Sequence, residues 1–394
     1  MRSEVAGGGL AAVAIGGSTT TLFSMRGEER LEKTFLRLDL PILRTYDEAA
    51  AYDDVLLANA DYVFEERVIS DFITTRRTVL VAENDAGALV AVAAICRAGE
   101  IREWADIIER ETPAAALPEG RARLVTPNDV SGSFNRRLRK REAAMVLKAT
   151  PDRRDEIERR MFKGAYKGAT DIVTKFVMPE PALHATRLAA ALGLRPNIIT
   201  AASLVLVCLA IYFFMRGEFI AGAAAGWLMS FLDTVDGKLA RVTLQSSKFG
   251  NLFDHGIDVI HPPFWYAAWA YGLAGAPAIA AGGSADPVWS ALWIANIGYV
   301  IGRLIEGYFV RRFKFEIHIW RPVDYWFRHI TSRRNPNLVM LTISALLGAP
   351  ALGLFAVAAW TVFSIVFHSA RAIAAEAQAA GGKPGAALQS WLAE

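Results

Sequence analysis

Residues 231–258 read FLDTVDGKLARVTLQSSKFGNLFDHGID and hold four aspartates between long apolar segments. Carboxylates are disfavoured at the edge of a lipid bilayer, so their presence there requires compensating cations. Asp233 and Asp236 are three residues apart and share one helix face, and Asp254 and Asp258, four apart, share another. Two helices joined by a short loop can turn these faces toward each other.

Four converging carboxylates repel one another strongly in a partly dry site. Divalent cations are the natural compensation, and hard oxygen ligands favour Mg²⁺ or Mn²⁺. The same stretch supplies Gly237, whose missing side chain lets a ligand approach the helix, and Arg241, which can reach a phosphate. Gly250 allows the next helix to begin close by. The stretch therefore predicts a site for metals and phosphates.

Six apolar segments surround and follow this stretch, and each is a candidate transmembrane helix: 198–215, 219–242, 252–273, 288–310, 338–349 and 351–372. The last two are short, and the sequence GAP at 348–350 predicts a tight reversal between them. A soluble protein would have to bury all six segments in its core. We therefore expect an α-helical polytopic membrane domain with six transmembrane helices.

The charges of the loops predict how this domain is oriented. The loop 274–287 has no lysine or arginine and is expected outside. The segment 311–337 carries seven of them and is expected inside: Arg311, Arg312, Lys314, Arg321, Arg328, Arg333 and Arg334. An integral protein of the cytoplasmic membrane follows, with both termini and the aspartates on the cytoplasmic side.

The spacing of the aspartates and their small and basic neighbours in 233–258 is Asp-x2-Asp-Gly-x2-Ala-Arg-x8-Gly-x3-Asp-x3-Asp. It resembles the complete signature of the CDP-alcohol phosphotransferase family, also called CDP-alcohol phosphatidyltransferases. The resemblance covers roughly residues 190–372 and includes the phrase LRPNIIT before the first span. It implies transfer of a phosphoalcohol from a CDP-alcohol donor to an alcohol or lipid acceptor, with release of CMP, as in phospholipid or inositol-type phosphodiester synthesis.

The resemblance also implies roles for individual residues. Asp233, Asp236, Asp254 and Asp258 would hold two Mg²⁺ or Mn²⁺ ions against the diphosphate. Asp258 would also act as the general base for the acceptor hydroxyl, which requires one of its oxygens to stay free of metal. Nucleotide contacts would come from Asn197, Gly237, Arg241 and Ser247.

Acceptor binding is predicted less directly. Arg303 and Glu306 lie three apart in the fourth span and can form either a structural ion pair or part of an acceptor pocket. Arg321, Arg333 and Arg334 could bind a phosphate of the acceptor, although arginines in an inside loop are expected in any case. The family further implies contact with membrane lipids and a homodimer. We expect no nucleic-acid partner.

Residues 1–140 predict a soluble α/β domain. The apolar strand LAAVAI is followed by the glycine-rich turn GGSTT, and a second strand ends near Asp61. This arrangement resembles a reduced nucleotidyltransferase, as in fusions with inositol-phosphate cytidylyltransferases. The turn lacks the usual G-x-G-x-R pattern, so we expect an inactive domain with a structural or regulatory role.

The remaining boundaries follow from composition. Residues 141–192 are read as a linker with juxtamembrane helices, 193–375 as the membrane domain and 376–394 as a cytoplasmic tail. The basic run 136–141 is either a solvated face or a contact with anionic headgroups. Two other functions stay open: a bifunctional enzyme that also makes its CDP-alcohol from CTP, and a divalent-metal transporter that uses the aspartates as a permeation site.

Overall fold

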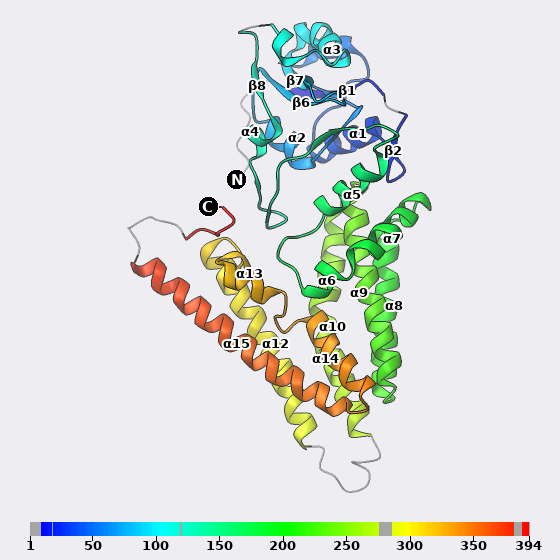
Figure 1. Cartoon of the computed structure of the whole chain (residues 1–394), viewed down its shortest axis with the longest axis vertical. Coiled ribbons are helices and arrows are strands. Elements are labelled where there is room, and N and C mark those ends of the chain that lie inside the picture. The colour runs from blue at the N-terminus through cyan, green and yellow to red at the C-terminus, as the bar shows by residue number, and fades with distance from the viewer. Residues whose placement is uncertain (1–8, 18, 119, 276–285, 382–387, 394) are drawn as a thin grey trace. The chain divides into compact units, whose positions relative to one another are not determined.

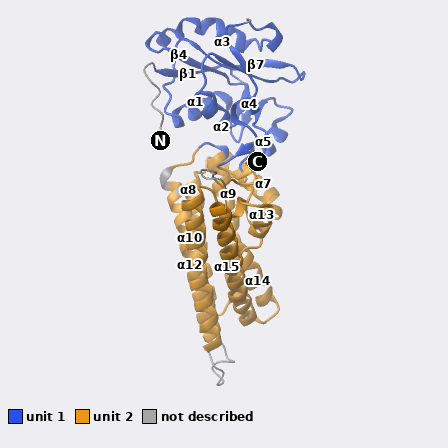
Figure 2. Ribbon diagram, turned by 90° about the vertical axis from the view of Figure 1, so that its left-hand side faces the viewer, with its two compact units in different colours: residues 1–136, 141–165, 242–244 blue, residues 137–140, 166–241, 245–394 orange. Residues whose placement is uncertain are grey.

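The computed structural model describes residues 9–17, 19–118, 120–275, 286–381 and 388–393, except for the side chains of residues 248, 249, 251 and 254. The chain forms two compact units, coloured separately in Figure 2. The first comprises residues 1–136, 141–165 and 242–244, and the second comprises 137–140, 166–241 and 245–394. The first unit thus extends beyond residue 140, through the helix α5 (Arg154–Gly164).

The first unit is built on a five-stranded sheet with the order β1-β4-β7-β6-β8. The pairs β1–β4 and β6–β8 are parallel, while β7 runs antiparallel to both of its neighbours. The strands are β1 (Leu10–Ile15), β4 (Asp54–Asn59), β6 (Thr78–Glu83), β7 (Leu89–Arg97) and β8 (Arg123–Val125). The strands β4, β6 and β7 are almost continuously apolar and buried, as expected of strands covered on both faces.

Helices cover both faces of this sheet. The helices α1 (Gly27–Arg37) and α2 (Glu66–Phe72) pack in one apolar cluster with the sheet, and α3 (Ile101–Glu109) packs in another. The predicted α/β character of the N-terminal region is therefore confirmed, and LAAVAI is the buried strand β1.

The glycine-rich turn and the strand-end aspartate that the sequence singled out lie together. Gly16 adopts φ 74°, and a Cβ added to it would lie 3.4 Å from Asn59 Oδ1 and 3.7 Å from Asp61 Oδ2. Burial raises the pKa of Asp61, and the nearby Glu111 carboxylate adds to the effect. The carboxyl ends of β1 and β4 thus form one small polar corner; the resemblance to a nucleotidyltransferase stays a prediction.

Gly27 offers a test of how tightly this unit is packed. A Cβ at Gly27, the first residue of α1, would lie 1.8 Å from the Ala60 carbonyl oxygen. Gly27→Ala is therefore expected to destabilise the unit by more than the roughly 1–3 kcal/mol of ordinary overpacking. Limited proteolysis across a temperature series, read within residues 19–118, measures this. Gly99→Ala, where a Cβ meets nothing within 4 Å, is the control and should leave the profile unchanged.

The second unit is helical (Figure 1). Two short helices, α6 (Ile172–Phe176) and α7 (Pro179–Ala191), precede the long ones. The six predicted apolar segments fall in α8 (Pro196–Met215), α9 (Phe219–Val242), α10 (Lys248–Ala274), α12 (Asp286–Phe313), α14 (Arg334–Leu346) and α15 (Pro350–Gly381). The helix α15 continues beyond its predicted end at residue 372, into the predicted tail. A short helix, α13 (Pro322–Arg328), lies in the arginine-rich loop.

Three of the described helices, α8, α12 and α15, are long and apolar enough to cross a membrane. The helix α14 has 13 residues and a length of about 20 Å, less than the roughly 30 Å of a hydrocarbon core. Six spans therefore stay a prediction. The orientation also stays a prediction, because most of the loop 274–287, which is expected on the outer side of the membrane, is not among the described residues.

Close packing fixes the long helices against one another. The helices α12 and α15 run side by side (Figure 1), and a Cβ added to Gly298 would lie 2.5 Å from Thr361 Cγ2. The Trp269 ring lies 4.9 Å from Phe214 and 4.5 Å from Phe219, and its indole nitrogen donates to the Pro350 carbonyl at 3.0 Å. Leu338 and Leu341 of α14 belong to the same buried cluster. The core thus joins α9, α10 and α14, which carry Asp233, Asp258 and Arg334.

Candidate active site

A cavity of about 640 Å³ opens in the second unit. Among the described side chains that line it, nine arginines and lysines outnumber five carboxylates. The cations are Arg139, Lys167, Lys238, Arg241, Arg303, Arg311, Arg328, Arg333 and Arg334, and the carboxylates are Asp171, Asp233, Asp258, Glu306 and Glu316. Such an excess of positive charge in a concave site concentrates anionic ligands.

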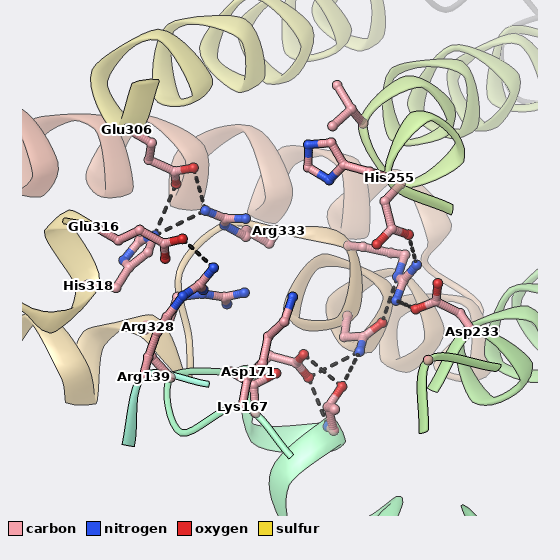
Figure 3. A pocket seen from close by; sticks show the side chains of 18 of the residues that line it. Arg139, Lys167, Asp171, Asp233, His255, Glu306, Glu316, His318, Arg328 and Arg333 are labelled. Atoms are coloured by element: carbon pink, nitrogen blue, oxygen red, sulfur yellow. Dashed lines mark hydrogen bonds and ion pairs between the residues drawn. The ribbon is translucent and has the colours of Figure 1, made fainter. Parts of the chain in front are cut away.

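At one end of the cavity, two of the predicted aspartates share one guanidinium. Arg334, the first residue of α14, donates from Nη2 to Asp233 Oδ2 on α9 at 2.6 Å and from Nη1 to Asp258 Oδ1 on α10. Figure 3 shows Asp233 turned toward this guanidinium. The side chains of Asp233 and Arg334 are 17% and 15% exposed. The two helices thus present their carboxylates to one point, where a cation already lies.

The third described aspartate of the set is Asp236, one helical turn from Asp233. It is buried, and its Oδ2 accepts a hydrogen bond from Thr200 Oγ1 at 2.5 Å. Its Oδ1 is buried and accepts no hydrogen bond within the described part of the chain. A buried carboxylate oxygen without a partner is costly, and a cation would satisfy it.

The fourth aspartate, Asp254, belongs to α10, but its side chain lies outside the described residues. Among the side chains that are described, no group of three or more potential metal ligands is assembled. The described chemistry still fits a divalent cation: Asp233 and Asp258 converge on a positive charge, and Asp236 keeps an unsatisfied oxygen.

The predicted nucleotide contacts lie in two places. Gly237 and Arg241 line the cavity, and a Cβ at Gly237 would lie 3.2 Å from Arg241 Nη2, so the glycine leaves room for this guanidinium. Asn197 and Ser247 lie together at the start of α10, where a Cβ at Gly250 would be 2.7 Å from Asn197 Oδ1 and 3.0 Å from Ser247 Oγ. Ser247 Oγ caps the helix by accepting from the Gly250 amide at 2.9 Å.

The other end of the cavity centres on Glu306. This carboxylate accepts from Arg303 at 3.3 Å, contacts His318 Nε2 at 3.2 Å and pairs with Arg333. The ion pair that the sequence allowed between Arg303 and Glu306 is therefore present. Arg321 lies elsewhere, since it is not part of the cavity lining and its Nη2 donates to Gln378 Oε1 at 3.3 Å.

Several lining residues were not predicted from the sequence. Lys238 lies 3.8 Å from the centre of the Tyr166 ring, close enough for a cation–π contact. Others belong to segments that the family signature does not reach: Arg139, Lys167, Asp171, Glu316, His318, Arg328 and Asn335. Two of them had drawn attention in the sequence, Arg139 through the basic run 136–141 and Arg328 through the arginine-rich loop 311–337, but neither pattern marked them as cavity residues.

Comparison with known proteins gives a family match over the aspartate signature. Residues 194–307 match the family described as CDP-alcohol phosphatidyltransferase. Archaetidylinositol phosphate synthase of Pyrococcus horikoshii is 40% identical over 70 residues, which is 18% of this chain and 37% of that protein. The chain thus spans little more than a third of the length of this curated relative.

Two crystal structures of Mycobacterium tuberculosis phosphatidylinositol phosphate synthase are also similar. The structure with CDP-DAG bound has a TM-score of 0.38 at 18% identity, covering 48% of this chain and 91% of the other. The structure with manganese and citrate has a TM-score of 0.37 at 20% identity, covering 48% and 87%. Likeness at these TM-scores does not define a common fold.

The family match contains all four aspartates of the signature as well as Gly237 and Arg241. The resemblance inferred from the aspartate spacing is thereby confirmed at the level of the family. The family model and the aspartate signature thus coincide within residues 194–307.

Proposed function

We propose that this chain is an integral-membrane transferase that moves a phosphoalcohol group from a CDP-alcohol to a second alcohol and releases CMP. The observation that carries this proposal is the convergence of Asp233 and Asp258 in a cation-rich cavity, within the segment that matches the family. The apolar helices α8, α12 and α15 support a membrane location. Six spans, cytoplasmic termini and a homodimer complete the proposal.

The four aspartates of the signature would hold two Mg²⁺ or Mn²⁺ ions, which neutralise charge on the diphosphate when bound. The chain's own residues supply the remaining steps. Arg241, beside Gly237, binds a phosphate of the nucleotide, and Asn197 and Ser247 contact its ribose or base. Asp258 takes the proton of the acceptor hydroxyl: its contacts within the described residues use only Oδ1, which leaves Oδ2 for this role.

The second end of the cavity favours an acceptor that carries a phosphate. Arg303 and Arg333 are arranged around a single carboxylate, Glu306, and further cations line the space between the two ends. Guanidinium groups are suited to phosphate because of their fork of donors. The similar archaeal protein is named archaetidylinositol phosphate synthase, which favours inositol phosphate as the acceptor to be tested.

Metal removal tests the proposal. Purified protein in lipid nanodiscs, given CDP-diacylglycerol and inositol phosphate, is expected to release CMP. Chelation should lower the rate by about a hundredfold or more, because several kcal/mol of charge stabilisation are lost. Added Mg²⁺ or Mn²⁺ should restore the rate. A metal transporter would instead carry Mn²⁺ into liposomes without any nucleotide, and that result would replace the proposal.

The N-terminal unit is proposed to be structural or regulatory rather than catalytic. With CTP and an alcohol phosphate, the full chain is expected to release no pyrophosphate. The alternative is that this unit makes the CDP-alcohol from CTP. The polar corner at Gly16 and Asp61 supports that alternative, because ligands of parallel sheets bind at the carboxyl ends of strands. Pyrophosphate release that is abolished by Asp61→Asn would make the protein a bifunctional enzyme.

A further inference from the structure

One wall of the cavity is formed by residues that precede the segment matched by the family model. Residues 137–140 and 166–171 are packed with the second unit, and Arg139, Lys167 and Asp171 from them line the cavity. The family match begins only at residue 194. We call residues 137–140 and 166–171 the juxtamembrane wall.

Hydrogen bonds fasten this wall to the rest of the cavity. The Gly168 amide donates to the Leu138 carbonyl at 2.7 Å, and the Gly168 carbonyl accepts from Tyr325 Oη at 3.1 Å. Asn335 Nδ2 donates to Asp171 Oδ1 at 3.1 Å. A Cβ at Gly168 would lie 2.2 Å from the Arg139 carbonyl oxygen, so only glycine permits this approach. The wall is therefore a built part of the site.

Arg139 is held in an unusual backbone conformation at the tip of this wall. Its φ of 54° lies in the left-handed region, which a turn normally fills with glycine or asparagine. The side chain is 24% exposed and forms an ion pair with Glu316, which is 29% exposed. Conformational strain that the surroundings hold in place often marks a functional position. Here the strain accompanies a guanidinium in the cavity (Figure 3).

A second observation at the same end of the cavity points to an anionic ligand. Arg328 lines the same cavity as Arg139 (Figure 3), and its Nη1 is buried without a hydrogen-bond partner among the described residues. A buried guanidinium donor without an acceptor is costly, so a ligand that brings oxygen atoms is favoured. Glu316 and Glu306 already pair with Arg139 and Arg333. Asp171 and Glu306 attract the Arg328 guanidinium, but its Nη1 still has a hydrogen to donate to such a ligand.

We infer that Arg139 binds the phosphate of the acceptor together with Arg328, so that the juxtamembrane wall sets the preference for a phosphorylated acceptor. This inference rests on the proposed transferase function. Glu316 holds Arg139 in position before the acceptor arrives, and the phosphate then takes its place as the partner of the guanidinium. Acceptor selectivity thus depends on residues outside the family segment.

The test compares Arg139→Gln with Arg136→Gln, an exposed arginine of the same basic run that is not in the cavity lining. Loss of a charge-assisted hydrogen bond should raise the KM for inositol phosphate by about tenfold or more. The KM for CDP-diacylglycerol and the rate with unphosphorylated inositol should stay unchanged. Arg136→Gln should match the wild type in all three.

A second variant is expected to change the KM for inositol phosphate in the opposite direction. Glu316→Gln leaves Arg139 in place but removes its competing partner and a negative charge, so the KM for inositol phosphate should fall. If the wild type releases CMP while Arg139→Gln and Glu316→Gln both keep the wild-type KM, this inference is overturned and the transferase proposal stands. If the wild type releases no CMP with any donor and acceptor, the transferase proposal itself fails.

Discussion

Asp258→Asn is expected to abolish most of the transfer, lowering CMP release by about 10²- to 10⁴-fold. The substitution keeps the shape of the side chain and an oxygen that can accept from Arg334, so the local fold should persist. It removes the negative charge that a metal requires and the basic oxygen that would take the acceptor proton. The measurement is the rate of CMP release at saturating donor and acceptor. Asp286→Asn, at the start of α12 and outside the cavity lining, is the control.

Binding of Mn²⁺ to the same variant separates the two roles of Asp258. If the Asp258→Asn protein binds Mn²⁺ like the wild type but turns over slowly, the residue acts chiefly as the base. If Mn²⁺ binding falls in parallel with the rate, its role is that of a ligand. Transfer at the wild-type rate would contradict both roles and would leave Asp233 and Asp236 to be tested in the same way.

Local patterns in the sequence predicted that aspartates of two consecutive helices converge, and Asp233 and Asp258 do meet at Arg334. Their role as metal ligands stays a prediction. Helical spacing places Asp233 and Asp236 on one face of α9, and the apolar lengths predict the helices that carry them. The fixed spacing of the signature then identified the family, because each of its residues lies in one short stretch of chain. The residues of a site can be recognised from their spacing in the sequence wherever neighbouring turns of two consecutive helices build the site.

The arginines of the cavity could not be predicted in the same way, because they meet their carboxylate partners only through packing. Arg334 is 101 residues from Asp233 and 76 from Asp258 along the chain. The charge rule for membrane loops already accounts for arginines in 311–337, so it gives no means of separating Arg334 and Arg333, in the cavity, from Arg321, outside it. Arg139 belongs to a basic run, and the simplest interpretation of such a run is a solvated or lipid-facing surface. The run therefore did not predict that Arg139 lines the cavity.

Arg334→Gln is expected to make the stability of the protein depend on metal. In the absence of metal, Arg334 is the shared counterion of Asp233 and Asp258, and all three side chains are at least partly buried. Removing one partner from such a cluster leaves carboxylates that repel each other. Because the Asp258 side chain is 37% exposed, the cost should lie below the roughly 3–5 kcal/mol of a fully buried pair. The thermal midpoint of the variant in a chelator should therefore fall well below that of the wild type.

Mn²⁺ should reverse this loss, because a divalent cation then takes over the charge that the guanidinium supplied. The midpoint of Arg334→Gln should rise more on adding Mn²⁺ than the wild-type midpoint does, and its affinity for Mn²⁺ should increase since a competing cation is gone. Arg321→Gln, which removes an arginine of the same loop outside the cavity, should behave like the wild type. Equal midpoints in chelator for Arg334→Gln and the wild type would show that the carboxylates need no counterion, and the argument for a cation site between Asp233 and Asp258 would lose its physical basis.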